Sequence, residues 1–179
     1  MVEQANTVEV DGSMLEGGGQ LFRMSVALAY IFNRKLRITK IRANRAKGGG
    51  LGNQHLTGLQ SVAKMLPGCE VSGNKKGSTE VVFDPCAKKI KQESFVADCG
   101  SPGAIGLILQ MLTPCLMFNS APSCDLLIKG GSMVGMSPNT DCLANVLLPV
   151  LRRMGAEISL EVPFDGYFPD VIGEAATKI

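Results

Sequence analysis

Apolar residues recur along the chain in two patterns, and each pattern predicts a different kind of element. In the first half, short runs of β-branched and apolar residues predict strands at residues 8–10, 36–41, 69–71 and 79–83. Between the first three of these strands, apolar residues spaced three and four apart predict helices at residues 19–32 and 53–66. The first half is therefore expected to run β-α-β-α-β-β.

The second half repeats this order of elements. Strands are predicted at residues 95–97, 124–129 and 156–162, and helices at residues 104–118 and 138–154, the last with a proline near its start. Equivalent positions lie 87 or 88 residues apart, which indicates an internal duplication, with chance agreement of a common pattern as the alternative. These pairs are Val10 and Ala97, Arg23 and Gln110, and Leu66 and Met154.

This pattern predicts an α+β protein made of two units, residues 1–94 and residues 95–169. Residues 170–179 contain neither a clear strand alternation nor a full helix, so we expect them to form a divergent C-terminal tail. Because the pattern breaks where another element is due, we expect a truncated or alternatively ended product.

Composition narrows the class of protein. A hydrophobic content of 45% in 179 residues indicates a packed core, while 5% aromatic residues and no Trp argue against aromatic platforms for stacking bases. The six cysteines form no C-x-x-C pair and no zinc spacing with the single His55, so we expect free thiols. With no secretory signal and no apolar stretch long enough to cross a bilayer, the chain is expected to be nuclear or cytoplasmic, not secreted and not in a membrane.

Charge is unevenly distributed, although the net charge is only +2. Seven basic residues and no acidic residue occupy residues 34–47, which predicts a local basic surface. The alternative is a solvated strand edge protected by charge. The seven residues are Arg34, Lys35, Arg37, Lys40, Arg42, Arg45 and Lys47.

A glycine-rich turn, residues 11–20, joins the first predicted strand to the first helix. Gly17, Gly18 and Gly19 carry no Cβ, so backbone N–H groups can approach an anion at the start of the helix. Glu16 precedes them as a candidate metal ligand, and Arg23 follows as a candidate phosphate clamp. The alternative is an ordinary connection whose glycines only relieve strain.

A second basic and glycine-rich loop, residues 41–56, joins the next strand to the next helix. Arg42 and Arg45 would converge on one anion, with Gln54 and His55 at the helix start. A lone histidine is more often a capping or core residue, but the neighbouring Arg42, Arg45 and Gln54 favour a place for His55 in an anion-binding site. In the second half, Gln110 lies among apolar residues. If its side chain is buried, a ligand would supply the hydrogen-bond partner for its amide; the alternative is that the side chain faces solvent.

One turn of the second half is a further candidate for the same cleft. Lys129-Gly130-Gly131-Ser132 ends a strand shortly before Pro138, and this turn could form another wall of the cleft.

Two common nucleotide-binding motifs are absent. Neither the G-x-x-x-x-G-K-[ST] motif nor G-x-G-x-x-G is present, so the chain has neither a P-loop nor a Rossmann site.

Taken in order, these motifs resemble the RNA 3'-terminal phosphate cyclase family, and their order and spacing match it from about residue 8 to residue 169. The matching pieces are Val10-Asp11-Gly12-Ser13, Glu16-Gly17-Gly18-Gly19-Gln20 with Arg23, Ile41-Arg42-Ala43 with Arg45, Gln54-His55-Leu56, Gly77-Ser78-Thr79-Glu80, Lys129-Gly130-Gly131 and Gly166-Tyr167-Phe168-Pro169.

The resemblance implies an ATP-dependent enzyme of the ligase class that converts an RNA 3'-phosphate to a 2',3'-cyclic phosphate by way of an AMP-carrying histidine. It implies cyclase or EPSP-synthase-like repeats, each a four-stranded sheet with two helices on one face. It gives supporting roles to Arg23, Arg42, Arg45, Gln54 and His55, and ATP contacts to Glu16, Gly17, Gly18, Gly19, Gln110 and Pro138, with Glu16 also a ligand of magnesium.

The sequence departs from the family at three places. The family's AMP-accepting histidine lies downstream in a part that this sequence does not contain, so no catalytic residue is assigned and the chain is expected to be inactive alone. The residues between Arg45 and Gln54 differ from the usual Pro-Gly-Leu-Arg, and Asp170-Val171-Ile172 replaces a glycine run.

Two other functions remain open. The first is a non-catalytic, cyclase-like RNA-binding or ribosome-biogenesis protein, and the second is a sugar-phosphate transferase of related fold. We also expect self-association through an exposed sheet edge.

Overall fold

The computed structural model describes residues 7–45, 48–91, 93–119 and 123–179. The chain divides into two compact units, Met1–Lys89 and Ile90–Ile179, and each unit has its own sheet and helices. No helix in the described ranges has the length and apolar character needed to span a membrane.

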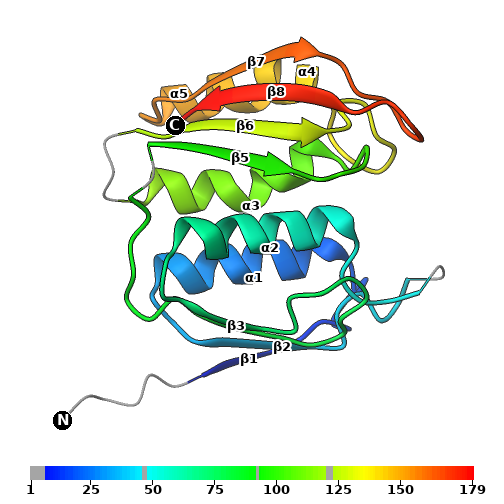
Figure 1. The fold of residues 1–179 in the computed structure, drawn as a ribbon, viewed down its shortest axis with the longest axis vertical. Helices are drawn as coiled ribbons and strands as arrows, with labels where there is room; N and C mark the ends of the chain where they lie inside the picture. The colour runs from blue at the N-terminus through cyan, green and yellow to red at the C-terminus, as the bar shows by residue number, and fades with distance from the viewer. Residues whose placement is uncertain (1–6, 46–47, 92, 120–122) are drawn as a thin grey trace. The chain divides into compact units, whose positions relative to one another are not determined.

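The first unit is a four-stranded sheet with two helices, in the predicted β-α-β-α-β-β order (Figure 1). The strand order is β1-β2-β4-β3, in which β1 and β2 are parallel and the other pairs are antiparallel. The elements are β1 (Val8–Asp11), α1 (Gly19–Ile31), β2 (Leu36–Thr39), α2 (Asn53–Met65), β3 (Glu70–Ser72) and β4 (Val81–Asp84).

The core of this unit lies between the sheet and its helices. Helices α1 and α2 lie side by side over one face of the sheet, and both bury their apolar stripe (Figure 1). Alternate residues of β2 and β4 point into the same core, as expected for strands with one covered face. Fully buried members include Phe22, Val26, Leu36, Ile38, Leu59, Val62, Val81 and Phe83.

The second unit repeats this topology. Its strand order is β5-β6-β8-β7, which is the order of the first unit with every number raised by four, and its one parallel pair is again the first two strands. The structure thus confirms the duplication and the α+β class. The elements are β5 (Ser94–Asp98), α3 (Ile105–Met117), β6 (Asp125–Gly130), α4 (Thr140–Cys142), η1 (Leu143–Leu147), α5 (Leu148–Arg153), β7 (Ser159–Phe164) and β8 (Gly173–Lys178).

The C-terminal residues are a strand, so the prediction of a divergent tail without strand or helix is wrong. Strand β8 lies inside the second sheet, pairing along its whole length with β6 and on its other side with β7. Its inward residues, Gly173, Ala175 and Thr177, are small. Because small residues give little alternation in hydrophobicity, the strand left no clear signal in the sequence.

The helix predicted at residues 138–154 forms a continuous helical run that starts later and changes pitch. It begins at Thr140, where Asn139 caps it by accepting a hydrogen bond from the Cys142 amide at 2.7 Å, so Pro138 lies just outside. The middle of the run, η1, is a π-helix that ends two residues before Pro149, whose missing N–H breaks the regular bonding pattern.

Candidate anion-binding site

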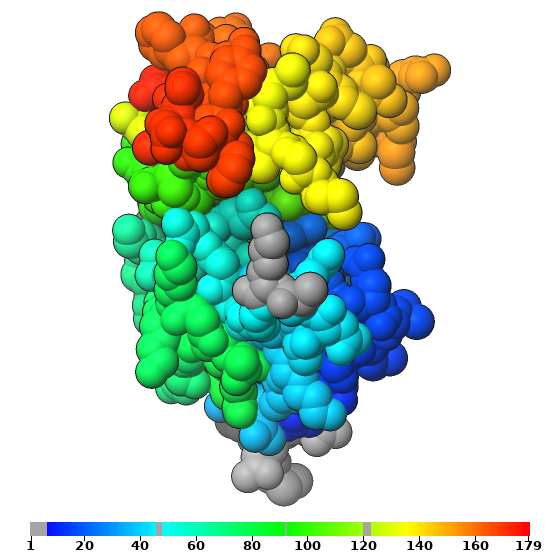
Figure 2. Space-filling view, turned by 90° about the vertical axis from the view of Figure 1, so that its right-hand side faces the viewer, coloured from blue at the N-terminus to red at the C-terminus, as the bar shows by residue number. Residues whose placement is uncertain are grey.

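Two loops of the first unit meet at one edge of its sheet. Since β1 and β2 are parallel, their carboxyl ends lie at the same edge, and each runs through its loop into a helix. Asn44 ties the loops together by donating its amide to the carbonyl of Ser13 at 3.0 Å and, less closely, to that of Leu15 at 3.5 Å. Figure 2 shows the cyan segment that holds the second loop against the blue N-terminal segment.

The glycines of the first loop are required by close approach. A Cβ on Gly18 would collide with Glu16 Oε1 and lie 2.9 Å from Arg45 Nη2. A Cβ on Gly19 would collide with His55 Nε2 and lie 2.9 Å from Arg23 Nη1. Thus the loop backbone passes directly against polar side chains. At Gly19 these include the buried His55 ring, which leaves no room for a side chain, whereas at Gly18 they are the movable ends of Glu16 and Arg45.

Both helices begin beside this cluster without a side-chain cap. The N-cap residues are Gly18 for α1 and Gly52 for α2, neither helix has a cap hydrogen bond from a side chain, and neither has an acidic residue in its first turn. The first N–H groups of a helix carry a partial positive charge and need acceptors. Because Gly19 and Gly52 both lie next to the His55 ring, an anion at this point would serve both helix ends.

Three guanidinium groups add full positive charge to the two helix ends. Arg23 is only 6% exposed, with Nη1 3.4 Å from His55 Nε2. Burial, followed by the charges of Arg42 and Arg45, lowers the pKa of Arg23 to about 10, and burial and Arg45 also lower the pKa of Arg42. Burial is the larger cause of these shifts, and repulsion between the guanidinium groups is the smaller one, which a bound phosphate would relieve.

The other two arginines are held at the rim of the cluster. Arg42 Nη1 donates to the Gly50 carbonyl at 2.8 Å, and Arg45 Nη2 lies 3.9 Å from Glu16 Oε1. A bidentate guanidinium matches the oxygen spacing of a phosphate. The arrangement is therefore a candidate polyanion site with one carboxylate, that of Glu16, at its edge.

His55 is a buried, neutral imidazole. It is 4% exposed and meets the edge of the Phe22 ring at 6.1 Å between centroids. Burial is the main cause that lowers its pKa to about 3, with Arg42, Arg23 and Arg45 adding to it. Because a guanidinium only donates, the 3.4 Å contact assigns Nε2 as acceptor and places the proton on Nδ1, which has no hydrogen-bond partner among the described residues.

Glu16 is the candidate metal ligand in this cluster. Its side chain is 72% exposed, and it belongs to no group of three possible metal donors in the part of the chain that the structure describes. Magnesium is commonly held by one or two carboxylates together with substrate phosphates and water. The single exposed carboxylate of Glu16, beside a candidate phosphate site, fits this shared mode of magnesium binding and does not fit a site in which protein side chains supply all the ligands.

The basic run at residues 34–47 forms the expected local basic surface only in part, where Arg42 and Arg45 lie near Arg23. Carboxylates from other segments face four of its members, including Arg45, which lies beside Glu16. Strand β2, on which part of the run lies, is inside the sheet, so the alternative of a charged edge is wrong. Lys47 lies outside the described residues. The other pairs are Lys35 with Asp84 at 3.6 Å, Arg37 with Glu80 at 2.8 Å and Glu9 at 3.7 Å, and Lys40 with Asp11 at 2.8 Å.

The remaining predicted site residues lie in α2 and in the second unit. Gln54 is half-buried as the second residue of α2. Gln110 is half-buried on α3, one turn after Gly106, where a Cβ would lie 2.7 Å from the carbonyl oxygen of Pro138. Since residues four apart share a helix face, Gln110 and the Pro138 loop lie on the same side of α3.

Two of the motif turns in the second unit also meet. Ser132 donates its hydroxyl to Asp165 Oδ1 at 2.7 Å and accepts the Gly166 amide at 3.0 Å. The turn after β6 is therefore joined to the Gly166–Pro169 turn by a buried hydroxyl. This contact and the Asn44 bridge were missed from the sequence, where each was one small polar residue in a loop.

Comparisons with known proteins place the chain among related sequences. The model of the family described as RNA 3'-terminal phosphate cyclase matches residues 14–179. Curated relatives named RNA 3'-terminal phosphate cyclase include one from Pyrobaculum aerophilum, 41% identical over 96% of this chain and 48% of its own length. Another, from Archaeoglobus fulgidus, is 43% identical over 90% of this chain and 48% of its own length.

More distant comparisons include a relative from Dictyostelium discoideum, named a probable RNA 3'-terminal phosphate cyclase, which is 37% identical over 94% of this chain and 38% of its own length. An EPSP synthase structure from Acinetobacter baumannii aligns with a TM-score of 0.44 at 10% identity, covering 98% of this chain and 48% of that one.

The chain thus spans about half the length of the first curated relatives it matches. The family match extends over both units and includes the glycine loop, the arginine cluster and His55. On this match and these identities, the chain belongs to the RNA 3'-terminal phosphate cyclase family.

Proposed function

We propose that this chain contributes the phosphate-binding half of an ATP-dependent RNA 3'-terminal phosphate cyclase. One observation carries the proposal: two helix N-termini without side-chain caps and three arginines lie around a glycine loop whose backbone closely approaches the charged side chains. Such a site is suited to binding phosphate groups. Both ATP and an RNA 3'-phosphate present that chemistry.

In the proposed reaction, AMP from ATP is joined to the RNA 3'-phosphate and pyrophosphate leaves. The neighbouring 2'-hydroxyl then attacks the activated phosphorus, loses its proton and displaces AMP to close the 2',3'-cyclic phosphate. Arg23, Arg42 and Arg45 hold phosphate oxygens and offset the negative charge that accumulates during transfer. A magnesium ion bound by Glu16 would neutralise further phosphate charge.

We assign His55 a positioning role and not that of the AMP acceptor. A nucleophilic imidazole needs an exposed lone pair, whereas the His55 ring is buried, with Nε2 accepting from Arg23 and the proton on Nδ1. It is the single histidine of the sequence, so the AMP-carrying step is assigned to no residue of this chain. Incubation with ATP labelled in its α-phosphate should leave the protein unlabelled, and label on His55 would overturn this role.

RNA binding tests the phosphate site directly. The chain should bind an RNA that ends in a 3'-phosphate more tightly than the same RNA ending in a 3'-hydroxyl, and Arg45→Ala should remove most of that difference. Arg45 is suited to the test because its side chain is exposed, so its loss should not disturb folding. Arg34→Ala, an exposed arginine beyond the other end of α1, is the matched control. Equal affinity for both RNA ends would favour a non-catalytic RNA-binding protein.

A further inference from the structure

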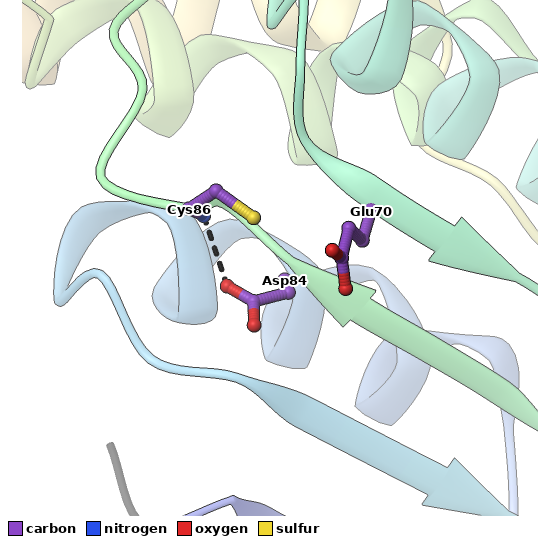
Figure 3. Close-up of side chains that lie close together, drawn as sticks. All are labelled: Glu70, Asp84 and Cys86. Atoms are coloured by element: carbon purple, nitrogen blue, oxygen red, sulfur yellow. Dashed lines mark hydrogen bonds between the residues drawn. The ribbon is translucent and has the colours of Figure 1, made fainter. Parts of the chain in front are cut away.

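A second group of reactive side chains lies at the open end of the β3–β4 hairpin, in the same unit. Glu70 is the first residue of β3 and Asp84 the last residue of β4, and the antiparallel register places them directly opposite each other. Cys86 follows in the turn after β4. One ligand atom from each residue lies within 4.8 Å of the other two (Figure 3).

The two carboxylates of this cluster are only partly balanced by cations of the described residues. Like charges opposite each other on neighbouring strands destabilise the pair. Among the described residues, the only cation in an ion pair with these two carboxylates is Lys35, with Nζ 3.6 Å from Asp84 Oδ2. A bound cation would therefore relieve the repulsion between Glu70 and Asp84.

The cluster is held in shape by its own backbone. The Cys86 amide donates to Asp84 Oδ1 at 2.9 Å, which fixes the carboxylate beside the thiol, and Figure 3 shows this bond and the sulfur turned toward Glu70. The nearby Cys69 thiol is directed elsewhere, with Sγ 3.7 Å from the Ala63 carbonyl. The available donor set is therefore one thiol and two carboxylates.

This donor set selects the kind of cation. A thiolate prefers zinc and similar metals, whereas magnesium and calcium prefer oxygen alone. In a tetrahedral zinc shell the donor atoms are about 3.5 Å apart, given zinc–ligand distances of about 2.0 to 2.3 Å. Donors already within 4.8 Å need only small side-chain rotations to reach this geometry, and the partial exposure of all three residues permits them.

We propose that Glu70, Asp84 and Cys86 form a binding site for a thiophilic divalent cation such as Zn²⁺, with water as the fourth ligand. Coordination takes the Cys86 sulfur as thiolate, and its proton leaves to solvent. The ion links the start of β3 to the turn after β4 and stabilises the first unit by binding the folded state alone. The site is separate from the arginine cluster and shares no residue with it.

Cobalt is the spectroscopic probe for this site. Titration of the reduced 179-residue chain with Co²⁺ should produce a thiolate-to-cobalt charge-transfer band and the intense visible bands of tetrahedral cobalt, both of which Zn²⁺ should displace. Cys86→Ser should remove the charge-transfer band, whereas Cys142→Ser, the matched change at an exposed thiol of the second unit, should leave it unchanged. An equal band in Cys86→Ser, or no band in the wild-type chain, would overturn the proposal.

Charge variants test the two carboxylates. Glu70→Gln should weaken Co²⁺ binding at least about tenfold, since it removes one ligand from an exposed position without changing the shape of the side chain. Lys35→Gln should tighten binding because it removes the cation that competes for Asp84. Unchanged or weaker affinity in Lys35→Gln would contradict the role given to Asp84. Circular dichroism of the metal-free variants establishes that each is folded.

Discussion

Burial of His55 as a neutral imidazole has a measurable consequence in acid. Its pKa is lowered from 6.5 to about 3, mainly by burial and further by the neighbouring arginines. In the unfolded chain His55 is therefore protonated below about pH 6.5, whereas in the folded chain it is protonated only below about pH 3. Stability is unaffected above this window and decreases as the pH falls through it.

The size of the effect follows from the two pKa values. One pKa unit corresponds to about 1.4 kcal/mol, so at about pH 5 the unfolded state gains about 2 kcal/mol relative to neutral pH from this residue alone. Other groups also titrate in acid, and the contribution of His55 is therefore measured as a difference. His55→Gln keeps an acceptor for Arg23 and cannot titrate, so its stability should fall less between about pH 7 and about pH 5, by about 2 kcal/mol.

The assay is simple because the chain has a single histidine. The Cε1–H resonance of His55 should show no inflection between about pH 8 and about pH 5 in the folded chain, and should titrate near its ordinary pKa in urea. Urea unfolding of the wild-type chain and His55→Gln at several pH values supplies the free energies. An inflection between about pH 6 and about pH 7 in the folded chain would refute the buried neutral ring.

The same resonance reports on the anion site. Inorganic phosphate bound among Arg23, Arg42 and Arg45 would offset their charge, so it should raise the pKa of His55. The pKa should remain below 6.5, because burial is the larger cause and phosphate does not reverse it. A pKa that is insensitive to phosphate would place the bound anion away from the ring.

Two further predictions follow from the packing. Gly19→Ala should lower the free energy of unfolding by about 1 to 3 kcal/mol and reduce phosphate binding, because the new Cβ meets the buried His55 ring. The matched variant Gly18→Ala should lose less stability, because its Cβ meets the movable end of Glu16. Thermal unfolding of both variants measures the difference, and equal losses would contradict the close approach at Gly19. Deletion of residues 170–179 should abolish cooperative unfolding of the second unit because it removes an interior strand, which amide hydrogen exchange would detect, and retained protection there would contradict the pairing.

The sequence by itself determined the elements with strong periodicity. Helices α1 and α2 begin at the predicted residues and end within one residue of the predicted ends, since a core-facing apolar stripe repeats at a spacing that only a helix satisfies. The duplication was also readable, because the order of elements and their separation are properties of the chain. Strand β8 was not, since Ala175 and Thr177 become core residues only by pairing between two other strands.

The sequence also identified the two glycine loops, but only the tertiary structure decided how they combine. Parallel pairing of β1 and β2 brings residues far apart in the sequence, Gly19 and His55, into contact, and long-range contacts of this kind leave no periodic signal. The tertiary structure also decides how each charge is used. Lys40 and Arg45 look alike in the basic run, yet Lys40 pairs closely with Asp11 at 2.8 Å, whereas Arg45 lies 3.9 Å from Glu16 at the rim of the candidate anion site. Local pattern fixes which segments are helices and strands, while the environment that sets burial and pKa exists only after those segments have packed.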